Sequence, residues 1–259
     1  MFSYKAVYVI VLREFKRFFR QKGRLVVTLA RPLIWLLIVG SGFSGIINIG
    51  AHGKGDGASY MQFILPGIVG MTILFSSVFS TISVVWDREF GFLREMLVAP
   101  VSRTTIVAGK LLSGTLLSLF QGATLLVIAP LLGLSLSLPG FAAMLLLMFL
   151  VSLAITSFGL FVASYLTSLE GFNVIMNFIV LPMFFLSGAL YPVDALPQPL
   201  KLLSYINPLC FGVDAFKHAL LDGNGRLAAE IPLIVDIAFL AVFSAVFIAA
   251  AAISFERRK

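Results

Sequence analysis

Charged residues are scarce in this chain. Of its 259 residues, 12% are Asp, Glu, Lys or Arg, whereas 59% are hydrophobic. Soluble domains carry about twice that charged fraction. The composition therefore excludes an ordinary soluble protein and indicates that lipid surrounds most of the surface.

Cysteine and histidine are scarcer still. Cys210 is the only cysteine, so an internal disulfide and a zinc site of several cysteines are excluded. We interpret Cys210 as buried filler rather than a nucleophile. The two histidines, His52 and His218, are far apart in the sequence and predict no metal cluster.

Motifs for chemistry are also missing. The sequence contains no Gly-x-x-x-x-Gly-Lys-Ser/Thr loop to hold ATP phosphates. Without a nucleophile, a metal site or an acid–base pair, an integral membrane enzyme is the weakest interpretation. Asp236 is the main carboxylate inside an apolar run, where it either anchors the helix near the outer interface or takes part in transport. An ion-coupled carrier normally needs several such groups.

Long apolar runs are abundant. Each is about as long as the ~20 residues that a helix needs to cross the ~30 Å hydrocarbon layer, where helices satisfy the backbone internally. Pro and Gly interruptions leave four to six crossings open, and we choose six. The predicted spans are Leu25–Ile47, Met61–Trp86, Ile106–Leu132, Phe141–Ala163, Phe172–Tyr191 and Ile231–Ser254.

The basic residues are distributed unevenly. Fifteen of the 19 Lys and Arg residues lie in the first 31 residues, in or beside the connection after the second span, or at the end of the chain. The positive-inside rule therefore predicts that both termini are cytoplasmic. We interpret these charges as topology signals and contacts with anionic lipid, and we expect no nucleic-acid partner.

The first 24 residues are amphipathic. Apolar residues recur at three- and four-residue steps, and Arg13, Lys16, Arg17 and Arg20 occupy another face. This pattern predicts a helix lying in the headgroup layer with its apolar side towards the lipid. The first apolar run is too long for a cleavable signal peptide, so we expect it to be retained as a span.

Two connections are more than turns. In residues 87–105, a short amphipathic helix is predicted to end before Pro100 and to offer Phe92, Leu93, Met96 and Leu97 to a partner protein. Residues 192–230 are apolar but broken by prolines. We expect them to fold back into the outer leaflet as one or two short helices.

Polar residues without charge line some spans. The second span carries Thr72, Ser76 and Ser80 on one face, and the fifth carries Asn173 and Asn177 one turn apart. A wet or ligand-facing surface and a packed, hydrogen-bonded surface are both open for the two asparagines. Small residues in the third and fourth spans are typical of close helix packing.

Two stretches carry a resemblance to a known family. Residues 86–103, read as WDREFGFLREMLVAPVSR, resemble the cytoplasmic segment after the second span of type-2 ABC exporter membrane subunits. Residues 186–197, read as LSGALYPVDALP, and the following Asn207-Pro208-Leu209 resemble the outer end of that family's fifth span. The order and spacing of these motifs cover nearly the whole chain.

The resemblance implies an assembly. Two membrane subunits pair around a central path, and each docks an ATPase subunit that binds ATP and magnesium. No ATPase is fused in this sequence, so a separate one is expected. The implied ATPase-coupling residues are Asp87, Arg88, Glu89, Phe92, Leu93, Glu95, Met96 and Leu97. The implied path residues are Thr72, Ser76, Ser80, Asn173 and Asn177, and the implied outer lid includes Tyr191, Pro192, Pro197, Asn207 and Pro208.

The sequence thus predicts an all-α integral membrane protein in which residues 1–259 form one transmembrane domain. Its parts are six transmembrane helices, an N-terminal interfacial helix, a cytoplasmic coupling helix and short outer re-entrant helices. We expect the homodimeric membrane subunit of an ATP-driven exporter in a bacterial inner membrane. The expected substrate is an amphipathic molecule, lipid-like, glycan or drug-like. Alternating access and a squeezing motion are both open as the transport mechanism. An ion-coupled carrier and a non-transporting scaffold for an ATPase are the alternatives.

Overall fold

The computed structural model describes residues 3–23, 26–27, 30, 32–35, 37–38, 58–92, 101–128, 130, 137–220 and 229–257. Within these ranges every regular element is a helix, which confirms the all-α prediction. The elements are α1 (Tyr4–Arg20), α3 (Ala58–Glu89), α5 (Arg103–Ile128), α6 (Leu138–Tyr165), α7 (Leu169–Phe185), the 3-10 turn η2 (Val193–Ala195), α8 (Gln198–Ser204), α9 (Pro208–Leu220) and α10 (Leu233–Arg257).

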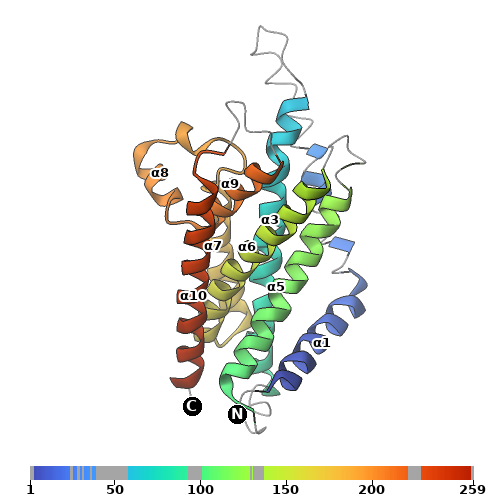
Figure 1. Ribbon diagram of the computed structural model, residues 1–259. Helices are drawn as coiled ribbons and strands as arrows, with labels where there is room; N and C mark the ends of the chain where they lie inside the picture. The colour runs from blue at the N-terminus through green and yellow to red at the C-terminus, as the bar shows by residue number, and fades with distance from the viewer. Residues whose placement is uncertain are drawn as a thin grey trace.

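The long helices form one bundle with α3 near its centre (Figure 1). Helix α3 packs against α5, α6, α7 and α9, while α10 packs against α6 and α9, and α1 packs against α5. Both ends of the described chain lie at the same end of the bundle, which we call the N/C end (Figure 1). Helices α8 and α9 lie at the opposite end, which we call the distal end.

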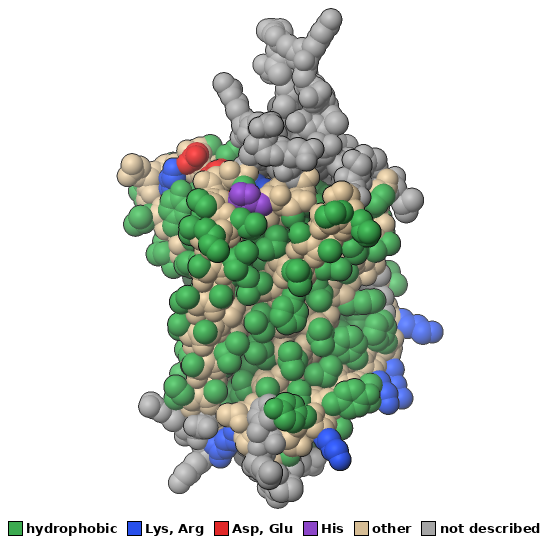
Figure 2. Space-filling view, in the orientation of Figure 1, with side chains coloured by type: hydrophobic (Ala, Val, Ile, Leu, Met, Phe, Trp, Pro, Cys, Tyr) green, Lys and Arg blue, Asp and Glu red, His purple; other side chains and the backbone are tan. Residues whose placement is uncertain are grey.

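Four of the described helices are long and apolar enough to cross a membrane: Ile64–Glu89, Arg103–Ile128, Leu138–Tyr165 and Leu233–Phe255. Helix α7 is apolar but has only 17 residues, or about 25 Å at 1.5 Å per residue. The predicted first span lies largely outside the described residues. Figure 2 shows hydrophobic side chains covering the middle of one face, with charged side chains mainly nearer its two ends. Six crossings therefore remain a prediction.

Small residues bring the central helices close together. A Cβ atom added at Gly114 of α5 would collide with Ser80 of α3 and Thr156 of α6. Close by, the Ser77 hydroxyl donates to the Ser118 hydroxyl at 2.9 Å across the α3–α5 contact. The prediction that small residues of the third and fourth spans serve close helix packing is confirmed at these positions.

The apolar segment after α7 contains short helices, as predicted. Helix α8 has 7 residues and α9 has 13, so neither can cross a bilayer. Helix α9 is buried from Pro208 to Lys217 against neighbouring helices. Burial raises the pKa of the Cys210 thiol to about 12, which agrees with a filler role rather than a nucleophilic one.

Several helix boundaries differ from the predictions. Asp87, Arg88 and Glu89 form the last turn of α3 instead of opening a separate cytoplasmic helix. The helix ends just before Gly91, whose φ of 79° is a conformation that glycine adopts easily. Helix α5 already starts at Arg103. Helix α7 ends at Phe185 rather than at Tyr191, because the chain forms turns around Gly188, where φ is 72°.

Candidate functional site

Four ionised side chains meet at the N/C end of the bundle. Lys110 of α5 donates to Glu14 of α1 at 2.7 Å and to Asp87 of α3 at 2.5 Å. Arg13 of α1 donates to the same two carboxylates at 2.8 Å each. We call Arg13, Glu14, Asp87 and Lys110 the ion network. It is balanced, with two cations and two anions.

Three members of the network, Glu14, Asp87 and Lys110, are buried, and Arg13 is partly exposed. The Lys110 side chain is 2% exposed and also donates to the Ser83 hydroxyl at 3.1 Å. Burial opposes ionisation of Glu14, but the charges of Lys110 and Arg13 outweigh it, so the pKa of Glu14 lies below its ordinary value. A buried pair of this kind is costly to break because the remaining charge loses its partner. The network therefore fixes α1 to the α3–α5 pair.

Helix α1 contacts protein along one face. Its buried residues are Ile10, Glu14 and Phe18, spaced one turn apart. Ile10 lies against Gly109 of α5, where an added Cβ would approach the Ile10 side chain to 2.9 Å. A helix is thus present where it was predicted, and its buried face includes the Glu14 carboxylate, which the sequence pattern did not single out. The place of this helix in the headgroup layer stays a prediction. Tyr4 and Tyr8 are exposed on other faces of the helix.

The residues that follow Asp87 tie α3 to other elements at the N/C end. Arg88 donates to the Leu166 carbonyl at 2.6 Å, and Glu89 accepts the Leu169 N–H at 3.0 Å. Both contacts reach the connection between α6 and α7. Phe92 is exposed, with the Arg13 guanidinium 4.8 Å from its ring centre. The other expected coupling residues, Leu93, Glu95, Met96 and Leu97, lie outside the described residues.

A cavity of about 320 Å³ lies next to the ion network between α1, α3 and α5. Its wall combines charged and aromatic side chains. Arg17 of α1 lies over the ring of Trp86 of α3, 5.2 Å from the centroid. The lining residues are Glu14, Arg17, Phe18, Gln21, Phe79, Ser80, Ile82, Ser83, Trp86 and Leu117. Such a mixed wall suits an amphipathic molecule better than a purely apolar one.

The expected path residues are not gathered in this cavity. Of the five, only Ser80 lines it. Thr72 is buried and donates to the Ile68 carbonyl at 2.8 Å, while the Ser76 hydroxyl is buried with no partner among the described residues. Asn173 and Asn177 are exposed on α7, where the Asn177 amide donates to the Asn173 carbonyl at 2.9 Å. Their face is therefore not packed inside a single copy of the chain.

The expected lid residues hold the distal segment in place. The Tyr191 hydroxyl donates to the Phe185 carbonyl at 2.7 Å. The Asn207 amide donates to the Met183 carbonyl at 2.7 Å and accepts the Leu209 N–H at 3.0 Å, at the start of α9. The prolines mark boundaries: Pro192 and Pro197 precede η2 and α8, and Pro208 begins α9.

A second polar group, most of which was not predicted from the sequence, lies at the distal end. We call Asp214, Lys217, His218, Glu230 and Asp236 the distal cluster. Asp214 accepts the backbone N–H groups of Glu230 and Ile231 at 2.9 Å each. Lys217 lies 3.9 Å from Asp214. Spacing along α9 could have revealed that positions 214, 217 and 218 share a face, but their approach to Asp236 depends on tertiary packing.

The family model for the ABC-2 type transporter matches residues 5–221. The chain belongs to the ABC-2 type transporter family, and it is a membrane-embedded permease subunit. It is 30% identical to the transport permease ycf38 of Cyanophora paradoxa over 224 residues, 83% of this chain and 74% of that protein.

Two further relatives also match most of the chain. The inner membrane transport permease YadH of Escherichia coli (strain K12) is 27% identical over 94% of this chain and 90% of its own length. Nodulation protein J of Rhizobium leguminosarum bv. viciae is 27% identical over 74% of this chain and 73% of its own length. These matches confirm the family that the two sequence stretches resemble.

Proposed function

We propose that this chain is the membrane subunit of an ATP-driven exporter for an amphipathic, lipid-like, glycan or drug-like substrate. The match of the ABC-2 transporter model to residues 5–221 carries this proposal. In the proposed assembly, two copies of the chain pair around a central path. Two copies of a separate ABC ATPase bind ATP and magnesium, which fits a sequence without a phosphate-binding loop.

The proposed coupling element is residues 87–105. Its first residues are anchored through Asp87 to α1 and α5, and through Arg88 and Glu89 to the α6–α7 connection. A force applied here by the ATPase would therefore reach several helices together. Closure of the ATPase subunits on ATP would move this element and switch the path between its two facings.

The proposed path uses the α3 and α7 positions Thr72, Ser76, Ser80, Asn173 and Asn177. Support comes from the exposed asparagines, whose face of α7 is open for a second copy or a substrate to contact. The cavity beside Ser80 offers an entrance with charged and aromatic walls. The distal segment, residues 192–230, would act as the outer lid.

We place the N/C end in the cytoplasm of a bacterium, with the protein in the inner membrane. The distribution of Lys and Arg supports this orientation, and the relative YadH is named an inner membrane permease. Reporters fused after Lys259 should then signal cytoplasm, and tags at Gly55 and Gly223 should be accessible from outside. A cytoplasmic signal at Gly223 would remove the six-span topology.

Substitution in the coupling element tests the proposed partnership. Leu93→Asp should release the ATPase in a pull-down, because losing an interface anchor often costs about 2 kcal/mol or more. The matched control is Leu138→Asp, an exposed leucine at the start of α6 and at the distal end. Both variants should insert into the membrane. Full ATPase binding and transport by Leu93→Asp would overturn the assignment of the coupling element.

Energy depletion separates the proposed exporter from an ion-coupled carrier. Export should stop in cells depleted of ATP while their ion gradients are maintained, and it should persist when the gradients are collapsed and ATP is present. The opposite result would favour the carrier. A chain that binds the ATPase but never changes its hydrolysis, whichever lipid or solute is supplied, would instead favour a scaffold.

A further inference from the structure

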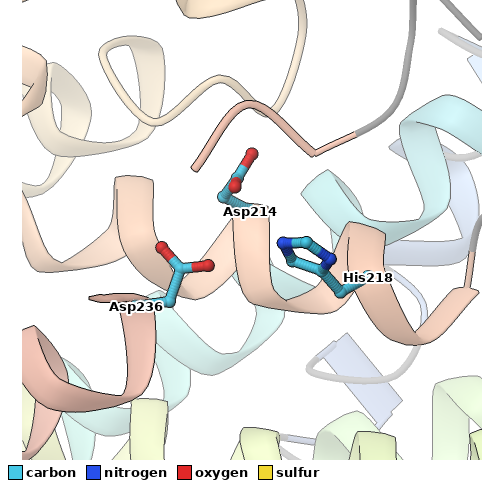
Figure 3. Close-up of side chains that lie close together, drawn as sticks. All are labelled: Asp214, His218 and Asp236. Atoms are coloured by element: carbon cyan, nitrogen blue, oxygen red, sulfur yellow. The ribbon is translucent and has the colours of Figure 1, made fainter. Parts of the chain in front are cut away.

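The distal cluster contains three side chains whose ligand atoms converge. Asp214 and His218 lie one turn apart on α9, and Asp236 lies in the first turn of α10 (Figure 3). One ligand atom from each residue can be chosen so that all lie within 4.8 Å of one another. We propose that Asp214, His218 and Asp236 bind a divalent first-row transition-metal ion that links α9 to α10.

Asp236 is a buried carboxylate whose surroundings favour binding of a cation. The residue is 0% exposed, and neither of its carboxylate oxygens has a hydrogen-bond partner in the described part of the chain. Figure 3 shows one oxygen of this carboxylate on the side that faces His218. Buried carboxylates are normally paired, hydrogen-bonded or bound to a metal, because an isolated charge is very unfavourable in an apolar interior.

The carboxylates around Asp236 outnumber the cationic side chains. Asp214, Glu230 and Asp236 contribute three carboxylates to the cluster, and Lys217 contributes one ammonium group, 3.9 Å from Asp214. The positive charge of Lys217 can neutralise one of these three carboxylates. This differs from the ion network at the N/C end, where cations and carboxylates are equal in number and joined by short contacts. A divalent ion would correct the excess of negative charge.

Two of the three side chains are already oriented. The carboxylate oxygens of Asp214 accept the N–H groups of Glu230 and Ile231, and the Nε2 atom of His218 lies 2.7 Å from the Ile231 carbonyl oxygen. Backbone groups that hold carboxylate and imidazole ligands in this way are common around metal sites. His218 is exposed, so an ion can reach the buried carboxylates from the surface.

The donor set indicates the class of ion. One imidazole nitrogen and two carboxylates suit Zn²⁺ and related ions better than the all-oxygen sites of calcium. For tetrahedral Zn²⁺ with bonds of about 2.1 Å, ligand atoms lie about 3.4 Å apart. The present separation of up to 4.8 Å must shorten by at most about 1.4 Å to reach this spacing. The ion would then fasten the lid helix to the last span.

Zinc binding to the full chain tests the proposal. The chain is purified in detergent with an affinity tag that contains no histidine, stripped with chelator and titrated with Zn²⁺ alone, with bound metal counted by mass spectrometry. Wild type should bind one Zn²⁺ per chain and show a higher melting temperature. His218→Ala and Asp236→Asn should each weaken zinc binding by at least about tenfold. Loss of a residue that only supports a metal ligand already lowers metal affinity by about 10–100-fold, and these two changes remove ligands themselves.

The control is Asp194→Asn, which removes an exposed distal carboxylate that pairs with Lys201 outside the cluster. It should bind zinc like wild type. His218→Ala changes an exposed side chain and keeps the test valid if Asp236→Asn fails to fold. Absence of stoichiometric binding in wild type would overturn the proposal, and so would equal binding by wild type, His218→Ala and Asp236→Asn, which would identify an adventitious ion only.

Discussion

The two ends of the bundle hold buried charge in different ways. At the N/C end, Lys110 and Arg13 neutralise Glu14 and Asp87 through contacts of 2.5–2.8 Å. At the distal end, carboxylates outnumber cations, and Asp236 has no hydrogen-bond partner among the described residues. A balanced network favours one fixed arrangement, whereas an unbalanced cluster can gain stability when a cation arrives. The fixed end is also where we place the contact with the ATPase.

Removal of Lys110 should have the largest effect. Lys110→Met leaves Glu14 and Asp87 buried with only Arg13 to balance them, and breaking a buried pair from one side costs about 3–5 kcal/mol. Thermal and denaturant unfolding in detergent should show this loss. Lys16→Met is the matched control, because Lys16 is an exposed cation of α1. Equal stability of the two variants would contradict a structural role for the network.

Glu14→Gln should have a smaller and pH-dependent effect. We expect a loss of about 1–3 kcal/mol at neutral pH, because Lys110 keeps Asp87 as a partner. The folded-state pKa of Glu14 lies below its ordinary value of 4.5, so its stabilisation is present above that pH and disappears as the pH falls through the lowered pKa. The stability difference between variant and wild type should therefore shrink in acid. A difference that grows in acid would contradict this sign.

Asp236→Asn should change metal-free stability by only about 1 kcal/mol in either direction, because the carboxylate makes no hydrogen bond with the described residues. This small change in metal-free stability would contrast with the large loss expected for Lys110→Met. With Zn²⁺ at 100 times the wild-type Kd, wild type should gain about 2.7 kcal/mol, and a variant that binds at least tenfold more weakly should gain about 1.4 kcal/mol or less. Thermal unfolding with and without zinc measures both quantities. A large metal-free loss would show that Asp236 already has a strong partner.

Asn177→Ala should have the smallest effect on stability, at most about 1 kcal/mol, because it removes one exposed hydrogen bond to the Asn173 carbonyl. If this face of α7 lines the path, the variant should alter substrate-stimulated ATP hydrolysis more than basal hydrolysis. Val174→Ala, an exposed change on the same helix, is the control. Reduced stability with an unchanged ratio of stimulated to basal activity would assign both asparagines to packing.

The sequence predicted the helices well because each depends on local patterns. Long apolar runs correspond to α3, α5, α6, α7 and α10, and amphipathic spacing corresponds to α1. The ends of the helices were predicted less accurately. The last turn of α3 is held to α1 and α5 through the contacts of Asp87 with Arg13 and Lys110, and such contacts between distant residues are invisible in a local pattern.

The charged groups were harder to predict for the same reason. Lys110 lies near the start of a span, where a lysine commonly extends to the headgroups. Only the packing of α1 and α3 shows that it is buried between Glu14 and Asp87. Asp236 was recognised as an unusual carboxylate, but its approach to Asp214 and His218 requires α9 to fold back beside α10.

The composition of the complex purified through this chain tests the proposed function most directly. The chain is co-expressed with an ABC ATPase from a neighbouring gene, purified through its own tag and measured by native mass spectrometry and by ATP hydrolysis. We predict two copies of the 28.1 kDa chain with two ATPase subunits, and hydrolysis that differs from that of the isolated ATPase. Recovery of the chain without any ATPase, while the protein remains folded and membrane-inserted, would contradict the proposal.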